Sequence, residues 1–370
     1  MINKSSQLIL LEGLPGTGKS TNSRIIMSNI EQSGQKVKWT HEVARPHPTL
    51  FFNEANLTQK EFDTFINQFP EHKEIINSLK IELDSTISFD LLEIEWNYMD
   101  RLDDVILKVL KQYDVWDFPL EKYINVALEK WKCFVEDVKK DDDLVVILDS
   151  SLFQFQIYTF LGKNVSYPVI ESFINQLFET ISELDPSIIY LYRKDVEDTI
   201  SYIEKTRGKE FSEQIWNRDK HLPYYQNRPT GADGYRSFLR DYHLTVEKLF
   251  EVTPFKKLRV EISDGNWNLY VSEMLSFLEI EKRSYDQPVT FPIGIYINEQ
   301  LGLNLEVHEG YIIDPSGNKK HLIPRNENEF YVEDLPIILR FEKPDKVVVI
   351  GEQLIDRWTA NRTIFVRRII

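Results

Sequence analysis

The chain has 370 residues, is 42% hydrophobic and 28% charged, and carries a formal net charge of −15. This length and composition are typical of a globular protein with two or three structural units, and they exclude a collagenous or disordered chain. The negative charge argues against a general nucleic-acid binder, so we expect no nucleic-acid partner.

A single cysteine excludes an intramolecular disulfide bond, and no run of about 18 or more apolar residues is present. The first residues, "MINKSSQLILLEG", contain too short an apolar run for a signal peptide. We therefore expect a cytoplasmic protein without a membrane partner.

The chain begins with the pattern of a strand, a loop and a helix. Residues 7–12 are a short apolar run, typical of a buried parallel strand. A glycine-rich loop follows, and "KSTNSRIIMSNIEQSG" predicts a helix that Gly34 ends. A second strand is predicted at 36–42. The order is that of a βαβ unit.

The middle of the chain alternates between helical and apolar strand patterns. Residues 43–60 are loop-like, and a helical insert is predicted at about 59–140 from apolar residues three and four apart. Further buried strands are predicted at 144–149, 187–192 and 257–262, and helices at 168–183, 235–250 and 267–280. The fold class expected for residues 1–284 is α/β, a parallel five-stranded sheet flanked by helices.

The pattern changes at about residue 285. From there to residue 370 the chain has short β-rich runs separated by turn signals, and "DPSGN" between two of them indicates a hairpin. We predict a separate all-β domain at 285–370, built as a small antiparallel sheet or barrel.

The segment from Gly13 to Ser20 fits Gly-x-x-x-x-Gly-Lys-[Ser/Thr], the Walker A pattern. Its glycines let backbone N–H groups wrap around phosphates, and the following helix adds its positive end. Lys19 is expected to reach the β- and γ-phosphates and Ser20 to ligate Mg²⁺. The predicted nucleotide-binding residues are Gly13, Pro15, Gly16, Thr17, Gly18, Lys19, Ser20 and Thr21.

Other motifs decide which class of nucleotide-binding protein fits. The one Asp-x-x-Gly, at 314–317, lies in the β-rich part and no Asn-Lys-x-Asp exists, which excludes a GTPase. Asp149 ends the third strand and is followed by Ser150, without the glutamate that ATPases use to polarise water, and Leu-Ser-Gly-Gly is absent. The remaining class transfers the phosphoryl group to a substrate and keeps water out.

The order of four segments resembles the nucleoside/nucleotide-kinase group of P-loop proteins, particularly its thymidylate-kinase and deoxynucleoside-kinase branch. The segments are "GLPGTGKST", "WTHE", "VVILDSSLFQFQIY" and "IIYLYRKDVEDTISYIEKTRGKEF". The resemblance covers about residues 7 to 280. It implies a P-loop NTPase fold, with ATP as the phosphoryl donor, Mg²⁺ as the cofactor and a lid at about 193–234.

The resemblance also implies roles for single residues. Glu42 matches the acid that ends the second strand and acts as base or orients the acceptor, and Asp149 matches the acid that ends the third strand and holds Mg²⁺. Which of the two is the base stays open. Arg207 matches the lid arginine, with Arg193 and Lys194 as further candidates. The catalytic candidates are Lys19, Glu42, Asp149 and Arg207, and the metal candidates are Ser20 and Asp149.

The chain departs from this family at one position and adds a domain. Ser150 stands where the family has an acceptor-binding arginine. The segment "ISDGNWN" (262–268) occupies the place of the family's adenine loop. The last 85 or so residues resemble a small β-rich domain appended to some β-lactamase-related serine hydrolases, and they bring no catalytic residue. We expect a structural or partner-binding role for them, including contact in a homodimer.

The expected function is an ATP-dependent kinase, a transferase that moves the γ-phosphoryl group to a small-molecule acceptor by in-line transfer. One alternative is a nucleotide-binding switch or sensor ATPase that uses the β-rich domain as its readout. Another is sulfotransferase-like chemistry, against which the intact Gly-Lys-Ser argues.

Overall fold

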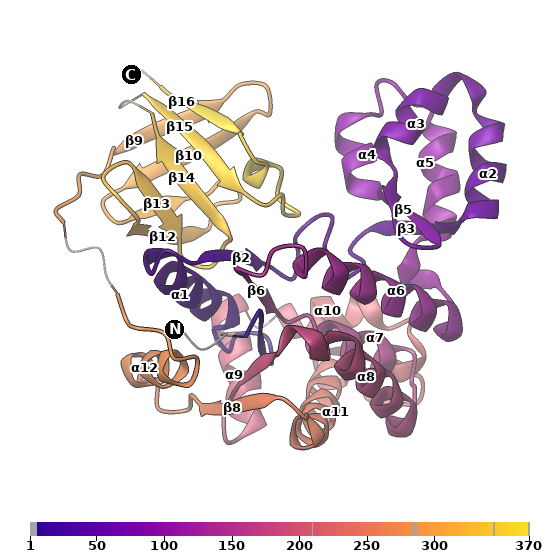
Figure 1. Ribbon diagram of the computed structural model, residues 1–370, viewed down its shortest axis with the longest axis horizontal. Coiled ribbons are helices and arrows are strands. Elements are labelled where there is room, and N and C mark those ends of the chain that lie inside the picture. The colour runs from indigo at the N-terminus through magenta and orange to yellow at the C-terminus, as the bar shows by residue number, and fades with distance from the viewer. Residues whose placement is uncertain (1–5, 209, 284–286, 343–344, 369–370) are drawn as a thin grey trace.

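The computed structural model describes residues 6–208, 210–283, 287–342 and 345–368. It shows an α/β core, an insert that projects from the core, and a β-barrel on the other side of the same end (Figure 1). The predicted domain boundary between residues 284 and 285 lies outside the described residues.

Five parallel strands form the central sheet, in the order β2-β6-β1-β7-β8. This confirms the predicted parallel sheet. The second strand is shorter than predicted, because it ends at Thr40 and leaves His41 and Glu42 in the following loop. The bounds are Leu8–Gly13 (β1), Lys36–Thr40 (β2), Leu144–Asp149 (β6), Ser187–Tyr192 (β7) and Lys256–Glu261 (β8).

Helices cover both faces of this sheet, which explains why its strands are continuous apolar runs. Leu8 and Leu10 of β1 pack in one core cluster, and Ile9 and Leu11 pack in another on the opposite face. Helices α1 (Lys19–Gln32) and α12 (Trp267–Phe277) cover the second face. The first face is covered by α6 (Leu120–Val138), α7 (Gln154–Gly162), α8 (Tyr167–Ile181) and α11 (Gly231–Val252).

Two helices occupy the segment predicted as a lid, α9 (Val196–Arg207) and α10 (Phe211–Asp219). The Asp195 side chain caps α9 by accepting from the Glu197 N–H. Gly208 follows the helix with φ of 93°, a conformation that suits glycine and turns the chain away.

The insert has its own hydrophobic core, in which Phe62, Phe65 and Phe89 pack together. Unlike the mostly helical prediction, it contains an antiparallel sheet in the order β3-β5-β4. These strands were missed because they are short and bury polar groups: Asn56 donates to Thr86 at 2.9 Å. The elements are β3 (Glu54–Thr58), α2 (Gln59–Gln68), α3 (Lys73–Leu79), β4 (Ile81–Glu82), β5 (Thr86–Asp90), α4 (Leu91–Asn97) and α5 (Asp104–Leu110).

The C-terminal part is a closed barrel of eight antiparallel strands, with β16 pairing back to β9. The all-β prediction is therefore confirmed as a barrel. The "DPSGN" turn joins β11 to β12, where the Asp314 N–H donates to the Asn318 carbonyl at 2.9 Å. The strands are β9 (Gly294–Asn298), β10 (Leu303–His308), β11 (Tyr311–Ile313), β12 (Lys319–Pro324), β13 (Glu329–Val332), β14 (Ile337–Phe341), β15 (Lys346–Gly351) and β16 (Ile364–Arg367).

The barrel contacts the core through polar groups. Glu31 of α1 accepts hydrogen bonds from Arg325 and Tyr331 of the barrel. Arg45, in the loop after β2, donates from its backbone N–H to the Gln353 carbonyl at 2.8 Å. The barrel therefore contacts α1 and the loop that carries Glu42.

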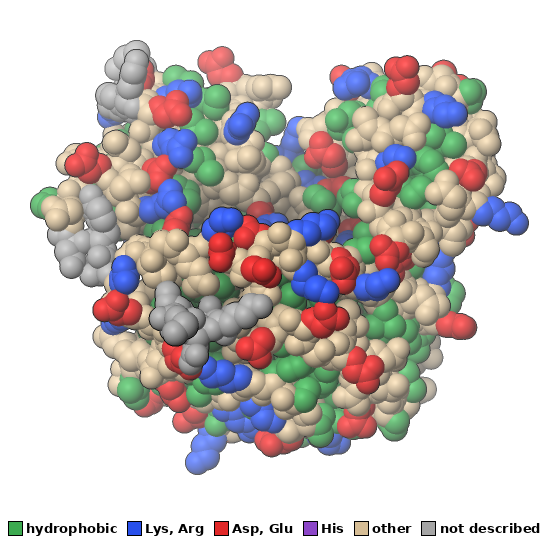
Figure 2. Space-filling view, in the orientation of Figure 1, with side chains coloured by type: hydrophobic (Ala, Val, Ile, Leu, Met, Phe, Trp, Pro, Cys, Tyr) green, Lys and Arg blue, Asp and Glu red, His purple; other side chains and the backbone are tan. Residues whose placement is uncertain are grey.

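Acidic and basic side chains are interspersed over the visible face of the molecule (Figure 2). None of the helices in the described part of the chain combines the length and apolar character needed to cross a bilayer.

Candidate functional site

The loop from Gly13 to Ser20 joins β1 to α1 and has the backbone torsions that require glycine. Gly16 and Gly18 have φ of 76° and 85°. A Cβ on Gly13 would lie 2.5 Å from the Leu191 carbonyl oxygen on β7. The Thr17 hydroxyl donates back to the Leu14 carbonyl at 2.8 Å, which closes the loop on itself. The glycines of the motif therefore stand at positions where the backbone torsions or the close packing exclude a side chain.

Lys19 is buried at the start of α1. Its Nζ donates to the Leu14 carbonyl at 3.0 Å, so the side chain folds back over the loop. Burial lowers the pKa of Lys19, and the charges of Glu42 and Asp149 oppose that effect. The N-cap, Gly18, provides no side chain to cap the first turn, so the helix end is open to an anion.

Ser20 and Asp149 supply oxygen atoms beside this loop. Asp149 is fully buried at the end of β6, and its Oδ1 accepts from the Glu42 N–H at 2.9 Å. Its Oδ2 has no hydrogen-bond partner among the described residues. The Ser20 hydroxyl lies 3.1 Å from His41 Nε2. It also favours the charged form of the Asp149 carboxyl and so works to lower its pKa. A buried carboxylate oxygen without a partner, next to a hydroxyl, fits a hard cation such as Mg²⁺.

Glu42 and Asp149 differ in how strongly they hold a proton. Burial works to raise the pKa of Glu42, but the charges of Lys19 and His41 outweigh it and the pKa lies below the ordinary value. Burial raises the pKa of Asp149, and the charge of Glu42 adds to this. The surroundings therefore stabilise the charged form of Glu42 and disfavour that of Asp149.

Glu12 is a third carboxylate at this site, and the sequence interpretation missed it. It is fully buried on β1 and accepts from the Leu152 N–H at 2.7 Å and the Gln154 N–H at 3.1 Å. Burial raises its pKa to about 7. The available signal was an acid inside the apolar run "LILLEG". Glu12 holds the start of α7, where Gln154 Nε2 donates to Glu42 at 2.5 Å.

Two arginines approach the loop from the lid segment. Arg207 is exposed at the end of α9, 4.9 Å from the Phe211 ring, and its charge acts on Lys19 and Glu42. Arg193 is buried beneath Tyr202, 4.4 Å from its ring, and its Nη1 has no partner in the described part of the chain. Tyr202 also lies against Gly16 of the loop. Arg193, given less weight than Arg207 in the sequence, is thus the better enclosed cation.

Trp267 lies on the other side of the loop. A Cβ on Gly18 would come within 2.9 Å of its ring. The ring is 40% exposed, which leaves a face open for a nucleotide base to stack on. It belongs to the segment 262–268 assigned to adenine, although the sequence did not single it out. Pro15 and Thr21 are half-buried in the loop and in the first turn of α1.

A cavity of about 440 Å³ opens on the Glu42 side of the loop. Its walls come from four separate parts of the chain: the loop after β2, the segment before α6, the start of α7, and the end of α10. Five aromatic side chains line the cavity: Phe51, Phe52, Trp116, Phe155 and Tyr158. Glu42 thus faces a space suited to a small molecule.

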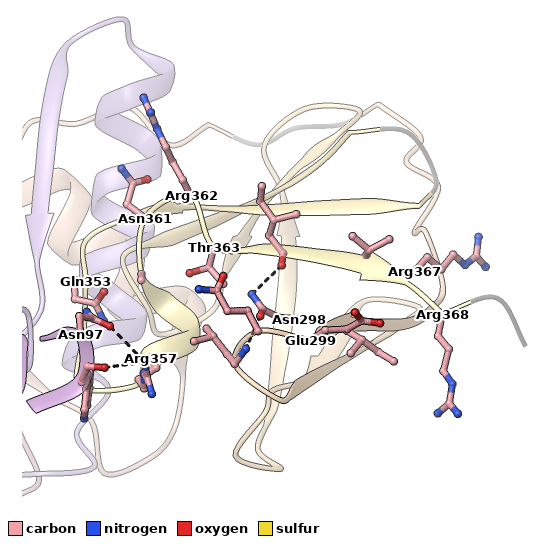
Figure 3. Close-up of a pocket in the computed structure, with 17 residues that line it drawn as sticks. Asn97, Asn298, Glu299, Gln353, Arg357, Asn361, Arg362, Thr363, Arg367 and Arg368 are labelled. Atoms are coloured by element: carbon pink, nitrogen blue, oxygen red, sulfur yellow. Dashed lines mark hydrogen bonds between the residues drawn. The ribbon is translucent and has the colours of Figure 1, made fainter. Parts of the chain in front are cut away.

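A larger groove of about 1180 Å³ lies between the barrel and the insert. Its lining includes Arg357, Arg362, Arg367 and Arg368, whose guanidinium groups point in different directions (Figure 3). They form no common anion site, and none of the groove's lining residues belongs to the phosphate loop. The cavity beside Glu42 is therefore the candidate acceptor site.

Comparisons with known proteins give little beyond this geometry. No protein-family model matches the chain, and no curated protein matches it. Among solved structures, the crystal structure of thymidylate kinase from Ehrlichia chaffeensis aligns at 15% sequence identity and a TM-score of 0.32, covering 75% of this chain and 100% of that chain. A likeness at this level carries no argument about activity, so the site residues have to carry it.

Proposed function

We propose that this protein is an ATP- and Mg²⁺-dependent phosphotransferase that moves the γ-phosphoryl group to a hydroxyl of a small molecule. The observation that carries the proposal is the place of Glu42. It is an ionised carboxylate beside the phosphate loop, and it also lines a cavity sized for a small acceptor. Because the loop that would bind ATP and the base lie next to the same cavity, the phosphoryl group could pass directly from ATP to the acceptor.

The proposal assigns one role to each residue of the site. The backbone of the loop and Lys19 bind the β- and γ-phosphates, and Arg193 and Arg207 offset the charge that spreads over the transferred group. Ser20 and Asp149 would hold Mg²⁺, which would supply positive charge against the phosphates. Trp267 provides the stacking face for adenine.

Glu42 takes the proton of the acceptor hydroxyl. The acceptor oxygen then bonds to the γ-phosphorus as the bond to the bridging oxygen of ADP breaks. Gln154 orients the Glu42 carboxylate, and Glu12 fixes Gln154 through the start of α7. The absence of a water-activating glutamate after Asp149 keeps hydrolysis slow, as a transferase requires.

The test is transfer of label from γ-labelled ATP in the presence of Mg²⁺ and a metabolite library. We expect labelled products that depend on the acceptor and disappear in Lys19→Ala. Label found only as free phosphate, at the same rate with every acceptor, would contradict the proposal.

One observation favours a second candidate, a nucleotide-dependent switch. The barrel binds Glu31 near the end of α1, the same helix that begins at the phosphate loop. Under this alternative, ATP and ADP would differ in the protease exposure of the barrel while no acceptor is phosphorylated.

A further inference from the structure

The cavity beside Glu42 is rich in hydrogen-bond acceptors and poor in available cations. Three carboxylates line it, those of Glu42, Asp114 and Asp219, against a single arginine, Arg218. His221 and Tyr158 are the other titratable side chains among the described residues that line it. The imbalance indicates what charge an occupant should carry.

Arg218 is already engaged. Its Nε and Nη2 donate to the two oxygens of Asp219 at 2.6 and 2.7 Å, and its Nη2 also donates to the Tyr158 hydroxyl at 2.9 Å. This fork occupies one edge of the guanidinium, and the ion pair with Asp219 offsets its charge. An anionic acceptor therefore finds no arginine free of an ion pair among the described residues that line this cavity.

Asp114, unlike Arg218, is a charged group of the cavity that lacks an ion-pair partner among the described residues. It is half-buried beside Trp116, and its Oδ1 accepts from the Trp116 N–H at 3.0 Å. It forms no salt bridge within the described ranges, and burial raises its pKa. The charge of Lys111 acts on Asp114, but Lys111 pairs with Glu95 at 3.3 Å. Burying the Asp114 carboxylate still costs free energy, which an ammonium group from a ligand would offset.

The neutral groups of the cavity also favour an occupant that carries a hydroxyl and a positive charge. Gln154 donates its Nε2 to Glu42, and its buried Oε1 has no partner in the part of the chain that the structure describes. This oxygen is ready to accept a hydrogen bond from a hydroxyl. The aromatic rings around it, among them Trp116 and Phe155, attract cations to their faces.

We propose that the acceptor is a small hydroxylated amine, an alcohol that carries an ammonium group, with its cation on Asp114 and its reactive hydroxyl at Glu42. The inference rests on the proposed phosphotransferase function and names the class of acceptor. The acceptor O–H proton moves to Glu42, the γ-phosphoryl group moves from ATP to that oxygen, and the ammonium group is unchanged.

The experiment compares acceptors that share one carbon skeleton. The full-length protein with Mg²⁺ and ATP is offered amino sugars and amino alcohols, each with its deaminated parent and its phosphate ester, together with thymidine and thymidine monophosphate. We expect kcat/KM for an amine to exceed that of its parent by roughly tenfold to a hundredfold, the range for a hydrogen bond to a charged group. Higher activity with the parents, the phosphate esters or the nucleosides would overturn the inference.

A matched pair of variants tests the role of Asp114. Asp114→Asn keeps the oxygen that accepts from Trp116 but removes the charge, whereas Asp117→Asn removes an exposed charge three residues away. Asp114→Asn should raise KM for the amine roughly tenfold or more and leave KM for ATP unchanged. Asp117→Asn should change neither. Equal effects of the two variants would contradict the assignment.

Binding separates this inference from the proposed function. If no acceptor is phosphorylated, calorimetry with ADP-loaded protein measures amine binding directly. Amine binding that Asp114→Asn weakens would support the inference and contradict the phosphotransferase. Absence of amine binding in both assays would overturn the inference, whatever other acceptor is phosphorylated.

Discussion

Three carboxylates surround Lys19, and their surroundings separate their affinities for protons. The pKa of Glu42 is lowered because Lys19 and His41 outweigh its burial, that of Asp149 is raised by burial, and that of Glu12 is raised to about 7. Glu42 is thus ionised and available as a proton acceptor at neutral pH. A cation beside Asp149 would favour its charged form.

Replacing the two acids should therefore have different effects. Glu42→Gln should lower kcat by roughly 10²- to 10⁴-fold, the usual contribution of a general base, with little change in ATP affinity. Asp149→Asn should instead raise the Mg²⁺ concentration needed for half-maximal activity. Steady-state kinetics across a Mg²⁺ titration distinguish the two, and a Mg²⁺ dependence altered equally by both variants would contradict these roles.

Lys19 should matter for the ligand more than for the fold. It is a desolvated cation that donates to the Leu14 carbonyl and to no other group among the residues that the structure describes. Lys19→Ala should weaken triphosphate binding roughly tenfold to a hundredfold, the loss of a charged hydrogen bond. A fluorescent ATP analogue measures the affinity and circular dichroism the fold. Tight binding by the variant would mean that the loop does not hold phosphates.

At the scale of elements, Glu12 joins β1 to the start of α7. Both carboxylate oxygens accept backbone N–H groups of the segment 152–154. The segment therefore cannot shift without breaking bonds in the sheet core. This connection positions Gln154, and through it Glu42, with the rigidity of the central sheet.

The raised pKa of Glu12 predicts a pH dependence of stability. Between pH 4.5 and about 7 the unfolded chain has lost this proton while the native state retains it, so the free energy of unfolding falls as pH rises. The loss is roughly 3 kcal/mol at 1.36 kcal/mol per pKa unit. Denaturant unfolding of the wild type and Glu12→Gln across this range measures the difference.

The slope of that difference is the readout, because glutamine also changes the hydrogen bonds to Leu152 and Gln154. The exposed Glu74→Gln, on α3, serves as the control and should run parallel to the wild type. A constant difference between wild type and Glu12→Gln from pH 4.5 to 7 would show that Glu12 does not titrate there.

For the whole molecule, the contact between barrel and core passes through Glu31. Arg325 and Tyr331 both donate to it, and Arg325 also pairs with Glu329, which accepts from Arg340 at 2.7 Å. Arg325 and Glu31 are partly buried, so water screens their charges less than it screens those of an exposed pair. The network links the helix of the phosphate loop to the barrel.

Breaking this network should loosen the barrel from α1. Glu31→Gln is expected to lower the free energy of unfolding by about 1–2 kcal/mol, the cost of weakening hydrogen bonds to the partly buried Arg325 and to Tyr331. Glu342→Gln disrupts an exposed pair with Lys346 in the same barrel and should cost less. Denaturant unfolding compares them, and hydrogen exchange at 321–333 should accelerate only in Glu31→Gln. Equal costs would contradict a coupling role.

Local patterns were enough to predict the five sheet strands, the glycine loop and the positions of Lys19, Ser20 and Asp149. Continuous apolar runs specify buried parallel strands, and a glycine pattern specifies torsions that other residues avoid. The insert sheet escaped prediction because β3 and β5 bury polar side chains such as Asn56 and Ser88, whose partners lie about thirty residues apart. Glu12 escaped because the acid inside the apolar run "LILLEG" does not reveal its partners, the Leu152 and Gln154 N–H groups, which lie about 140 residues away.

The residues of the phosphate loop are contiguous, so the chain's order alone was sufficient to specify a strand, a loop and a helix with phosphate-binding geometry. The cavity beside Glu42 draws on residues near 42–53, 114–116, 154–158 and 218–221, which meet only when distant segments of the chain pack together. Its charge balance depends on which groups are paired: Arg218 is bound to Asp219, and Asp114 has no salt-bridge partner among the described residues. Such pairings are long-range, and burial sets their strength, so they emerge only once the chain has folded.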